Sequence, residues 1–202
     1  YLIRPEIADD YLEIILSTKN KNTKLIYYVM DFHFLRLERQ FEFTNNPLTY
    51  EESKRLKYIE YTIFEKVDSI LTISSEELKF LNKNFNHKKS ILIPTFIYKQ
   101  SLPLSPNQDL KFRNGLLFVG GFSHIPNLDG INYFLNNSWD IVKNKIPSIT
   151  LHIVGSNVPD TLYKFAQKDK MIFIYENLSD IELFNLYDNV RITIAPIRYG
   201  AG

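Results

Sequence analysis

Short apolar runs alternate with amphipathic segments along this 202-residue chain, and the alternation limits the folds that it can adopt. Most of the apolar runs have four to six residues, which suits a buried strand and is too short for a helix. Strands that alternate with helices along a chain form parallel sheets with helices on their faces. We therefore predict an α/β protein with two Rossmann-like parallel-sheet halves.

Helix starts are marked by side chains that can cap a backbone. Thr49–Glu52, Ser74–Glu77 and Ser179–Glu182 have the spacing of a capping box. Strands are predicted at residues 1–3, 25–30, 69–73, 91–94, 116–119, 149–154, 171–175 and 190–195. Helices are predicted at residues 7–16, where Ile7, Tyr11, Ile14 and Ile15 have helical spacing, and at 47–67, 74–85, 126–135, 159–167 and 179–187.

The division between the halves is predicted at the segment KQSLPLSPNQDLK, residues 99–111. It contains two prolines and polar residues and has no hydrophobic period, as is typical of a linker. We expect residues 1–98 to form one half and residues 112–202 the other. The carboxyl ends of parallel strands meet at one edge, which is the ligand side of an open α/β sheet. Two such edges facing across a hinge would form a cleft.

A strand, a glycine pair and a helix follow one another near the middle of the chain. Gly120 and Gly121 come directly after the predicted strand, and Pro126 and Asn127 open the next helix. This order leaves backbone N–H groups at the positive end of a helix, which favours a phosphate or another anion. A glycine pair is also common as a simple tight turn, and the sequence alone leaves both interpretations open.

Composition excludes several classes of function. The chain has 24 Lys and Arg against 23 Asp and Glu, so no basic field indicates a nucleic-acid partner. It has no cysteine, which excludes a disulfide scaffold and thiolate metal ligands. His87, His124 and His152 lack the spacing of a zinc site, and no metal site is predicted. The absence of a G-x-G-x-x-G pattern argues against an enzyme that uses a dinucleotide.

Long stretches of the chain resemble one family. The strings LLFVGGFSHIPNLDGINYFLNNSWDIVKNKIPSITLHIVGSN and IYENLSDIELFNLYDNVRITIAPIRYGAG are similar to the nucleotide-sugar half of group 1 (family four) glycosyltransferases of the GT-B fold. LIYYVMDFHFLRLER and VDSILTISSEELKFL resemble the acceptor half. PIRYGAG and DFHFLR are the most specific parts. The resemblance implies a fragment that lacks the ends of the family pattern, with both halves incomplete.

The resemblance implies a retaining, metal-independent glycosyltransferase without a separate cofactor. Its substrate would be a nucleoside diphosphate sugar, and its acceptor a glycan or a lipid-linked molecule used in surface polysaccharide or glycoconjugate synthesis. The protein would be cytoplasmic, with peripheral contact at the inner face of the plasma membrane. The donor diphosphate would bind the amides of Gly120 and Gly121 and a second amide cluster at Gly200, Ala201 and Gly202.

The chain departs from the family pattern in two places. No Arg and Lys pair follows the first glycine turn, where His124 is the nearest cationic candidate. The family's two-glutamate motif is absent, and Tyr199 and Gly200 stand near the place of its first Glu. These departures favour an alternative for the chain in isolation, a non-catalytic sugar-nucleotide-binding or interaction module.

Asp31 and His33, directly after a predicted strand, are the candidate catalytic residues. His33 is a candidate base or hydroxyl ligand, and a packed or exposed imidazole is the plainer alternative. Asp31 would orient that imidazole or hold a sugar hydroxyl, or only cap the next turn. Arg36 and Arg39 are candidates for an anionic acceptor, although a solvated helix face is favoured.

The candidate donor-binding residues gather after the predicted strands of the second half. Arg198 is a candidate phosphate ligand or a surface residue, and Asn127 would reach the donor or, as favoured, cap its helix. Gly155 and Asn157 are expected to contact the base of the nucleotide, on the grounds of their position in the chain alone. The full set is Gly120, Gly121, Phe122, His124, Asn127, Gly155, Asn157, Arg198, Tyr199, Gly200, Ala201 and Gly202.

Overall fold

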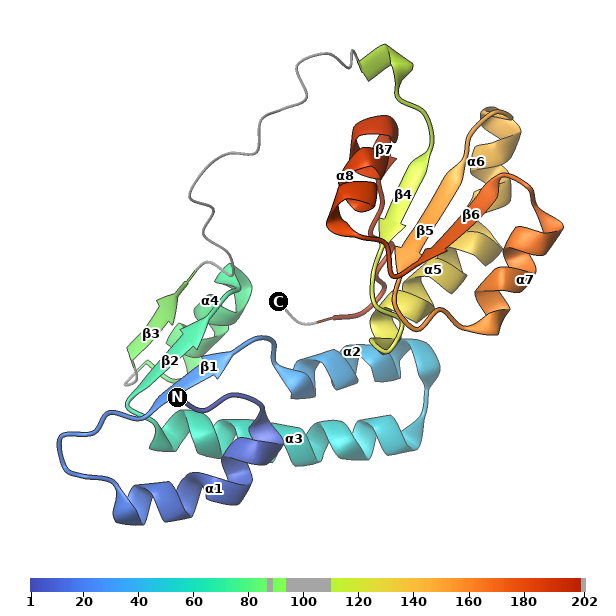
Figure 1. Ribbon diagram of the computed structural model, residues 1–202. Coiled ribbons are helices and arrows are strands. Elements are labelled where there is room, and N and C mark those ends of the chain that lie inside the picture. Colours follow the sequence, from blue (N-terminus) through green and yellow to red (C-terminus); the bar gives the residue numbers. More distant parts are fainter. Residues whose placement is uncertain (87–88, 94–109, 201–202) are drawn as a thin grey trace. The chain divides into compact units, whose positions relative to one another are not determined.

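The computed structural model describes residues 1–86, 89–93 and 110–200 (Figure 1). The chain divides into two compact units, Tyr1–Lys99 with Tyr199–Gly202, and Gln100–Arg198. Most of the predicted linker, residues 99–109, lies outside the described residues, as do Ala201, Gly202 and His87. Within the described ranges, no helix has both the length and the apolar character that crossing a membrane requires.

The first unit contains a parallel sheet of three strands in the order β1-β2-β3. The strands are β1 (Ile26–Val29), β2 (Ser69–Thr72) and β3 (Lys89–Leu92). Leu2 forms a parallel bridge with Tyr27 at the edge of β1, where the sequence predicts a strand stub. The helices of the unit are α1 (Pro5–Thr18), α2 (His33–Thr44), α3 (Pro47–Lys66) and α4 (Ser75–Asn84).

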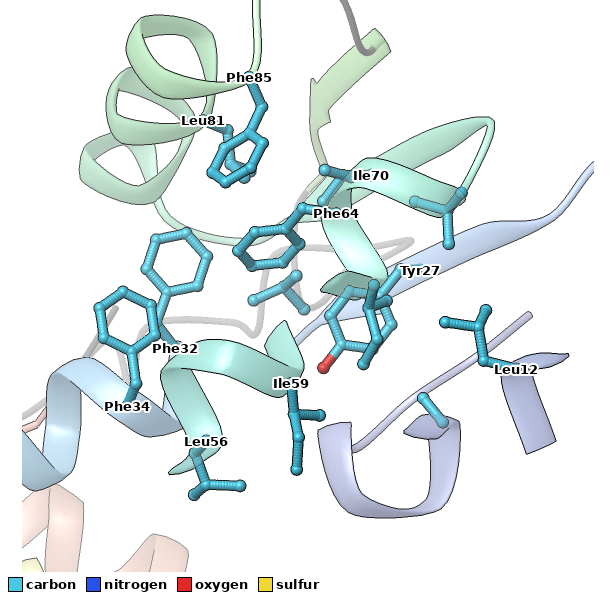
Figure 2. Packing of buried hydrophobic residues seen from close by; sticks show 14 of the residues in the cluster. Leu12, Tyr27, Phe32, Phe34, Leu56, Ile59, Phe64, Ile70, Leu81 and Phe85 are labelled. Carbon is cyan, nitrogen blue, oxygen red and sulfur yellow. The ribbon is translucent and has the colours of Figure 1, made fainter. Parts of the chain in front are cut away.

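Aromatic side chains contact one another within the core of the first unit, among aliphatic residues (Figure 2). The ring of Phe64 lies 5.5 Å from that of Phe32 and 5.2 Å from that of Phe85. The predicted inner face of α3 is confirmed, since Leu56, Ile59, Ile63 and Val67 are all buried. Burial of each such side chain contributes about 1.5–3 kcal/mol, so this face accounts for the attachment of α3.

The helical spacing of residues 7–16 identifies α1 but not its buried face. Ile7, Tyr11 and Ile14 are 51%, 56% and 59% exposed, whereas Ala8 and Leu12 are buried. Both sides of the helix carry apolar residues, and the side that packs is the one that meets α3.

Two of the predicted capping boxes are wrong in whole or in part. α3 begins two residues before Thr49, and its cap is Asn46, whose side chain accepts the amide of Leu48. Ser74 does cap α4 by accepting the amide of Glu77, at 3.4 Å. The Glu77 side chain does not return to Ser74, because it binds the backbone of another segment.

The second unit contains a parallel sheet of four strands in the order β6-β5-β4-β7. The strands are β4 (Leu116–Val119), β5 (Leu151–Gly155), β6 (Ile172–Glu176) and β7 (Ile192–Thr193). The helices are α5 (Ile125–Asn137), α6 (Trp139–Lys145), α7 (Asp160–Lys168) and α8 (Asp180–Asn189), with a short 3-10 helix at Leu110–Phe112. Strand order reverses beside β4, so the carboxyl end of β4 is a topological switch point.

Helices cover both faces of this sheet (Figure 1). Leu116 and Phe118 face a core shared with α5, α6 and α7, whereas Leu117 faces a smaller cluster with α8. Burial on both faces explains why β4 is a continuous apolar run. The predicted capping box of α8 is confirmed, with Ser179 and Glu182 each binding the other's backbone amide.

Candidate functional site

The turn after β4 presents unpaired backbone donors. The amide of Gly120 donates to Val154 at 3.0 Å, and that of Phe122 donates to Ser156 at 3.0 Å. Between and after them, the amides of Gly121, Ser123 and Ile125 have no acceptor within the part of the chain that the structure describes. These donors stand at the amino end of α5 and next to the switch point, which is where an anion is stabilised.

Close backbone packing shapes this turn. A Cβ atom at Gly155 would lie 2.1 Å from the carbonyl oxygen of Gly120, so the end of β5 approaches the turn as only a glycine allows. A Cβ atom at Gly120 would lie 2.8 Å from the Asn127 side chain. At Gly121 the nearest atom would be Ser156 Oγ at 3.4 Å, an ordinary contact. Close packing therefore explains why positions 155 and 120 are glycines, but it gives no reason for a glycine at position 121.

Asparagine side chains hold the turn together. Asn127 Nδ2 donates to the carbonyl of Gly121 at 3.0 Å, so Asn127 braces the turn and does not cap α5, whose N-cap is His124. Asn157, at a positive φ of 55°, donates to Ser123 Oγ at 2.9 Å. The structure thus brings Gly120, Gly121, Asn127, Gly155 and Asn157 to one edge.

The remaining donor candidates of this unit differ in exposure. His124 is exposed at the start of α5. The ring of Phe122 is buried and stacks on Phe118 at 6.0 Å, so it belongs to the core. Arg198 Nε donates to Asp129 Oδ2 at 2.8 Å, and its guanidinium lies 5.0 Å from the centre of the Tyr133 ring. The Arg198 side chain is therefore oriented by two residues of α5.

Tyr199 and Gly200 group with the first unit. The buried ring of Tyr199 lies 6.2 Å from the ring of Phe43, and the guanidinium of Arg39 donates to the carbonyl of Gly200. The Tyr199 ring is thus packed, and one of the predicted glycines is a partner of Arg39.

A cluster of charged side chains follows β1 in the first unit. His33 Nε2 lies 3.4 Å from Asp31 Oδ1, and Arg36 Nε lies 3.3 Å from Asp31 Oδ2. Glu6 from α1 reaches the other side of the imidazole, with 3.7 Å between its Oε1 and His33 Nδ1. Arg36 is part of this cluster, so the favoured interpretation of a solvated helix face is wrong for it.

Sequence reasoning missed Glu6, because it precedes the cluster by a whole helix and belongs to no local motif. The imidazole of His33 is half-buried, and burial lowers its pKa, with Arg36 acting in the same direction and Asp31 and Glu6 against it. A lowered pKa keeps the imidazole neutral near pH 7, where it has one donor and one acceptor nitrogen.

Within the described ranges, no group of three or more His, Cys, Asp and Glu side chains is arranged so that it could hold a metal ion. The turn after β4 offers backbone N–H donors. The cluster after β1 offers two carboxylate acceptors, an imidazole and a guanidinium donor.

No protein-family model and no curated protein matches the sequence. Solved structures do match. TarM has a TM-score of 0.62 and 13% identity, over 96% of this chain and 36% of that chain. A mutant of S. aureus TarM, in complex with fondaparinux, alpha-GlcNAc-glycerol and UDP, has a TM-score of 0.60 and 12% identity, over 92% and 34%. The chain has the fold of the GT-B glycosyltransferases.

The pneumococcal O-GlcNAc transferase GtfA, solved with UDP and GlcNAc, matches with a TM-score of 0.58 and 14% identity, over 96% of this chain and 36% of that chain. The chain therefore spans about a third of the length of these transferases, between 34% and 36%. The predicted α/β class with two parallel sheets is confirmed.

Proposed function

We propose that this chain binds the diphosphate of a nucleoside diphosphate sugar at the turn after β4, as part of a glycosyltransferase. The observation that carries the proposal is the set of unpaired amides of Gly121, Ser123 and Ile125 at the switch point. Two proteins of the same fold support it, since a TarM mutant is known in complex with UDP, and GtfA in complex with UDP and GlcNAc.

The amides act on the leaving diphosphate. Negative charge grows on this group as the bond to the sugar breaks, and fixed N–H donors stabilise that charge without reorganising. The positive end of α5 adds about 0.3–1 kcal/mol for an anion at its first turn. Gly121 has no packing neighbour that requires a glycine, and a phosphate close to its backbone would supply a reason.

The other donor residues have more modest roles in this proposal. Gly155 and Asn157 shape the edge, and Arg198, His124 and Tyr199 remain candidates for contacts to phosphate or sugar. Gly200, Ala201 and Gly202 remain the proposed second amide cluster.

In the first unit, His33 is the proposed group that contacts or deprotonates a hydroxyl, and Asp31 orients its imidazole. A neutral His33 is suited to accept a proton, and its 3.4 Å approach to Asp31 favours one orientation of the ring. The proposed reaction is a retaining transfer of a hexosyl group to a glycan or lipid-linked acceptor, with no metal and no cofactor. Its proposed setting is surface polysaccharide or glycoconjugate synthesis at the cytoplasmic face of the plasma membrane.

Nucleotide binding tests the donor site directly. We expect UDP or another nucleoside diphosphate to raise the melting temperature of the chain, with and without EDTA, because a ligand that binds only the folded state stabilises it. Gly121→Val should abolish this shift, since its side chain would cover the amides. Asn136→Ala, whose amide group binds Asn132 far along α5, is the matched control. An unchanged shift in Gly121→Val would contradict the proposal.

A non-catalytic sugar-nucleotide-binding module is the second candidate. The ion pair between Arg198 and Asp129 favours this second candidate. The Asp129 carboxylate already neutralises the Arg198 guanidinium, which is the cation expected to stabilise the leaving diphosphate. Release of UDP from a UDP-sugar separates the two functions. An enzyme releases UDP, and His33→Ala should abolish the release, whereas a module binds the sugar nucleotide unchanged.

A further inference from the structure

We propose that Glu60 and Glu77 are positioning residues that hold the backbone of residues 32–34, and through it the Asp31 carboxylate and the His33 imidazole. This inference rests on the proposed function, in which His33 contacts substrate and Asp31 orients its imidazole. The two carboxylates come from different helices and lie far along the chain from the segment that they bind.

Glu60 lies inside α3 and is fully buried. Its Oε1 accepts the amide of His33 at 3.2 Å, and its Oε2 accepts the amide of Phe34 at 2.9 Å. Both carboxylate oxygens thus bind the first turn of α2. Glu60 replaces the side-chain cap that α2 lacks, since its N-cap residue is Phe32.

Glu77 lies in the first turn of α4 and is 2% exposed. Its Oε1 accepts the amide of Phe32 at 2.9 Å, and its Oε2 accepts the hydroxyl of Thr72 at 2.7 Å. Three successive backbone amides therefore donate hydrogen bonds to two buried carboxyl groups; they are those of Phe32, His33 and Phe34.

Helix capping alone does not account for this arrangement. Taking a carboxylate out of water costs several kcal/mol, whereas the usual Ser or Asp N-cap at a solvent-exposed helix start avoids that cost. Burial raises the pKa of Glu60 to about 8, which shows that the ionised form is disfavoured even with two amide donors. Proteins depart from the usual patterns of helix capping and charge burial mainly where function requires a fixed geometry.

The geometry at stake is that of Asp31 and His33. Their contact spans two residues, so a small rotation of the intervening backbone changes the distance of 3.4 Å between Asp31 Oδ1 and His33 Nε2. The ring of Phe32 is anchored at the same time in the aromatic core, against Phe34 and Phe64 (Figure 2). The buried ring of Phe32 and the three hydrogen-bonded amides together restrict the backbone of residues 32–34 to one conformation.

Two glutamine substitutions separate positioning from bulk stability. In Glu60→Gln the carbonyl oxygen can accept one of the two N–H donors, but the NH₂ group faces the other and cannot accept it. A glutamate keeps an acceptor on both oxygens whether ionised or protonated, so the variant loses one hydrogen bond. In Glu77→Gln the carbonyl still accepts the amide of Phe32, and the NH₂ can donate to Thr72 Oγ1, so the bonds are kept. Glu52→Gln, whose side chain on α3 is 44% exposed, is the charge-matched control.

We expect Glu60→Gln in the full chain to lower kcat about 10- to 100-fold, with KM for the donor changed less than about twofold, because misplacement of a reacting group acts on the chemical step. Glu77→Ala, which leaves the Phe32 amide without its acceptor, should lower kcat in the same way, and Glu77→Gln, which keeps that acceptor, should restore most of it. Glu52→Gln should stay within about threefold of the wild type. A Glu60→Gln variant with unchanged kcat would overturn the inference.

Titration of the His33 imidazole by NMR gives a readout that needs no activity. In Glu60→Gln we expect the pKa of His33 to rise toward its ordinary value, because a loosened segment exposes the ring, and in Glu77→Gln we expect no change. An unchanged titration in Glu60→Gln would also overturn the inference. If the wild type neither binds a nucleotide nor transfers sugar, the proposed function fails, and the titration still decides the role of Glu60.

Discussion

Asp129 binds Arg198 through two hydrogen bonds, with Arg198 Nε 2.8 Å from Asp129 Oδ2 and Nη2 paired with Oδ1. The pair joins α5 to the segment that follows β7. Both side chains are less than a third exposed, at 19% for Asp129 and 29% for Arg198. A two-point ion pair of this kind restricts direction as well as distance, so the cation is held in one place.

Removal of either partner should destabilise the second unit. We expect Arg198→Met and Asp129→Asn each to lower the free energy of unfolding by about 1–3 kcal/mol, because each breaks a partly buried two-point ion pair. The double variant should cost less than the sum of the two, which urea denaturation in a double-mutant cycle measures. Strict additivity would show that the pair contributes nothing.

Gly155 and Gly121 should respond differently to the same substitution. We expect Gly155→Ala to lower the free energy of unfolding by about 1–3 kcal/mol, since the new Cβ would overlap the carbonyl of Gly120. Gly121→Ala should change it by less than about 0.5 kcal/mol, because its Cβ meets only an ordinary contact. Thermal and urea unfolding measure both, and equal losses would contradict the packing described for the turn.

The stability of the first unit should depend on the ionisation of Glu60. Burial raises the pKa of this carboxyl from an ordinary value of 4.5 to about 8, so between these values the folded state holds a proton that the unfolded state has released. Stability from this group is therefore complete below pH 4.5 and falls as the pH rises to 8, by at most about 1.4 kcal/mol per pH unit.

His33 acts in the opposite direction, because its pKa is lowered, so its contribution is lost as the pH falls through the folded pKa. Comparison with Glu60→Gln isolates the glutamate. The difference in free energy of unfolding between wild type and variant should decline from pH 5 to pH 8, and a constant difference would rule out the raised pKa.

The buried face of α1 can be tested by paired truncations. Leu12→Ala should lower the free energy of unfolding by about 2–5 kcal/mol, because Leu12 is 1% exposed and its loss leaves a cavity. Ile14→Ala, at a side chain that is 59% exposed, should cost less than about 0.5 kcal/mol. Chemical denaturation measures both, and the reverse order would place the other face of α1 in the core.

The helix caps give a further matched pair. Ser179→Ala should cost about 1 kcal/mol, since Ser179 accepts the amide of Glu182 at the start of α8. Thr49→Ala should change stability by less than about 0.5 kcal/mol, because Thr49 lies inside the first turn of α3 and Asn46 is the cap. A larger loss at Thr49 than at Ser179 would contradict this assignment of caps.

Much of the fold could be predicted because its causes are local. The run Leu116–Val119 is a strand between turn residues, and the α8 capping box joins residues three apart, so neighbours in sequence carry the whole signal. The alternation of strands and helices likewise determined the α/β class and the carboxyl edge at which the glycine turn lies. The donor and catalytic roles of the site residues stay predictions.

Tertiary structure alone decided which partners these local elements found. Periodicity describes one segment, so it could not choose between two apolar faces of α1, nor place Glu6 beside His33. Glu77 has the spacing of a capping box, yet its carboxylate binds Phe32, 45 residues earlier, because packing of α4 brings those amides within reach. A buried carboxylate binds the N–H donor that lies nearest to it in the folded protein. Which donor is nearest depends on how the helices pack, so the sequence of one segment cannot reveal it.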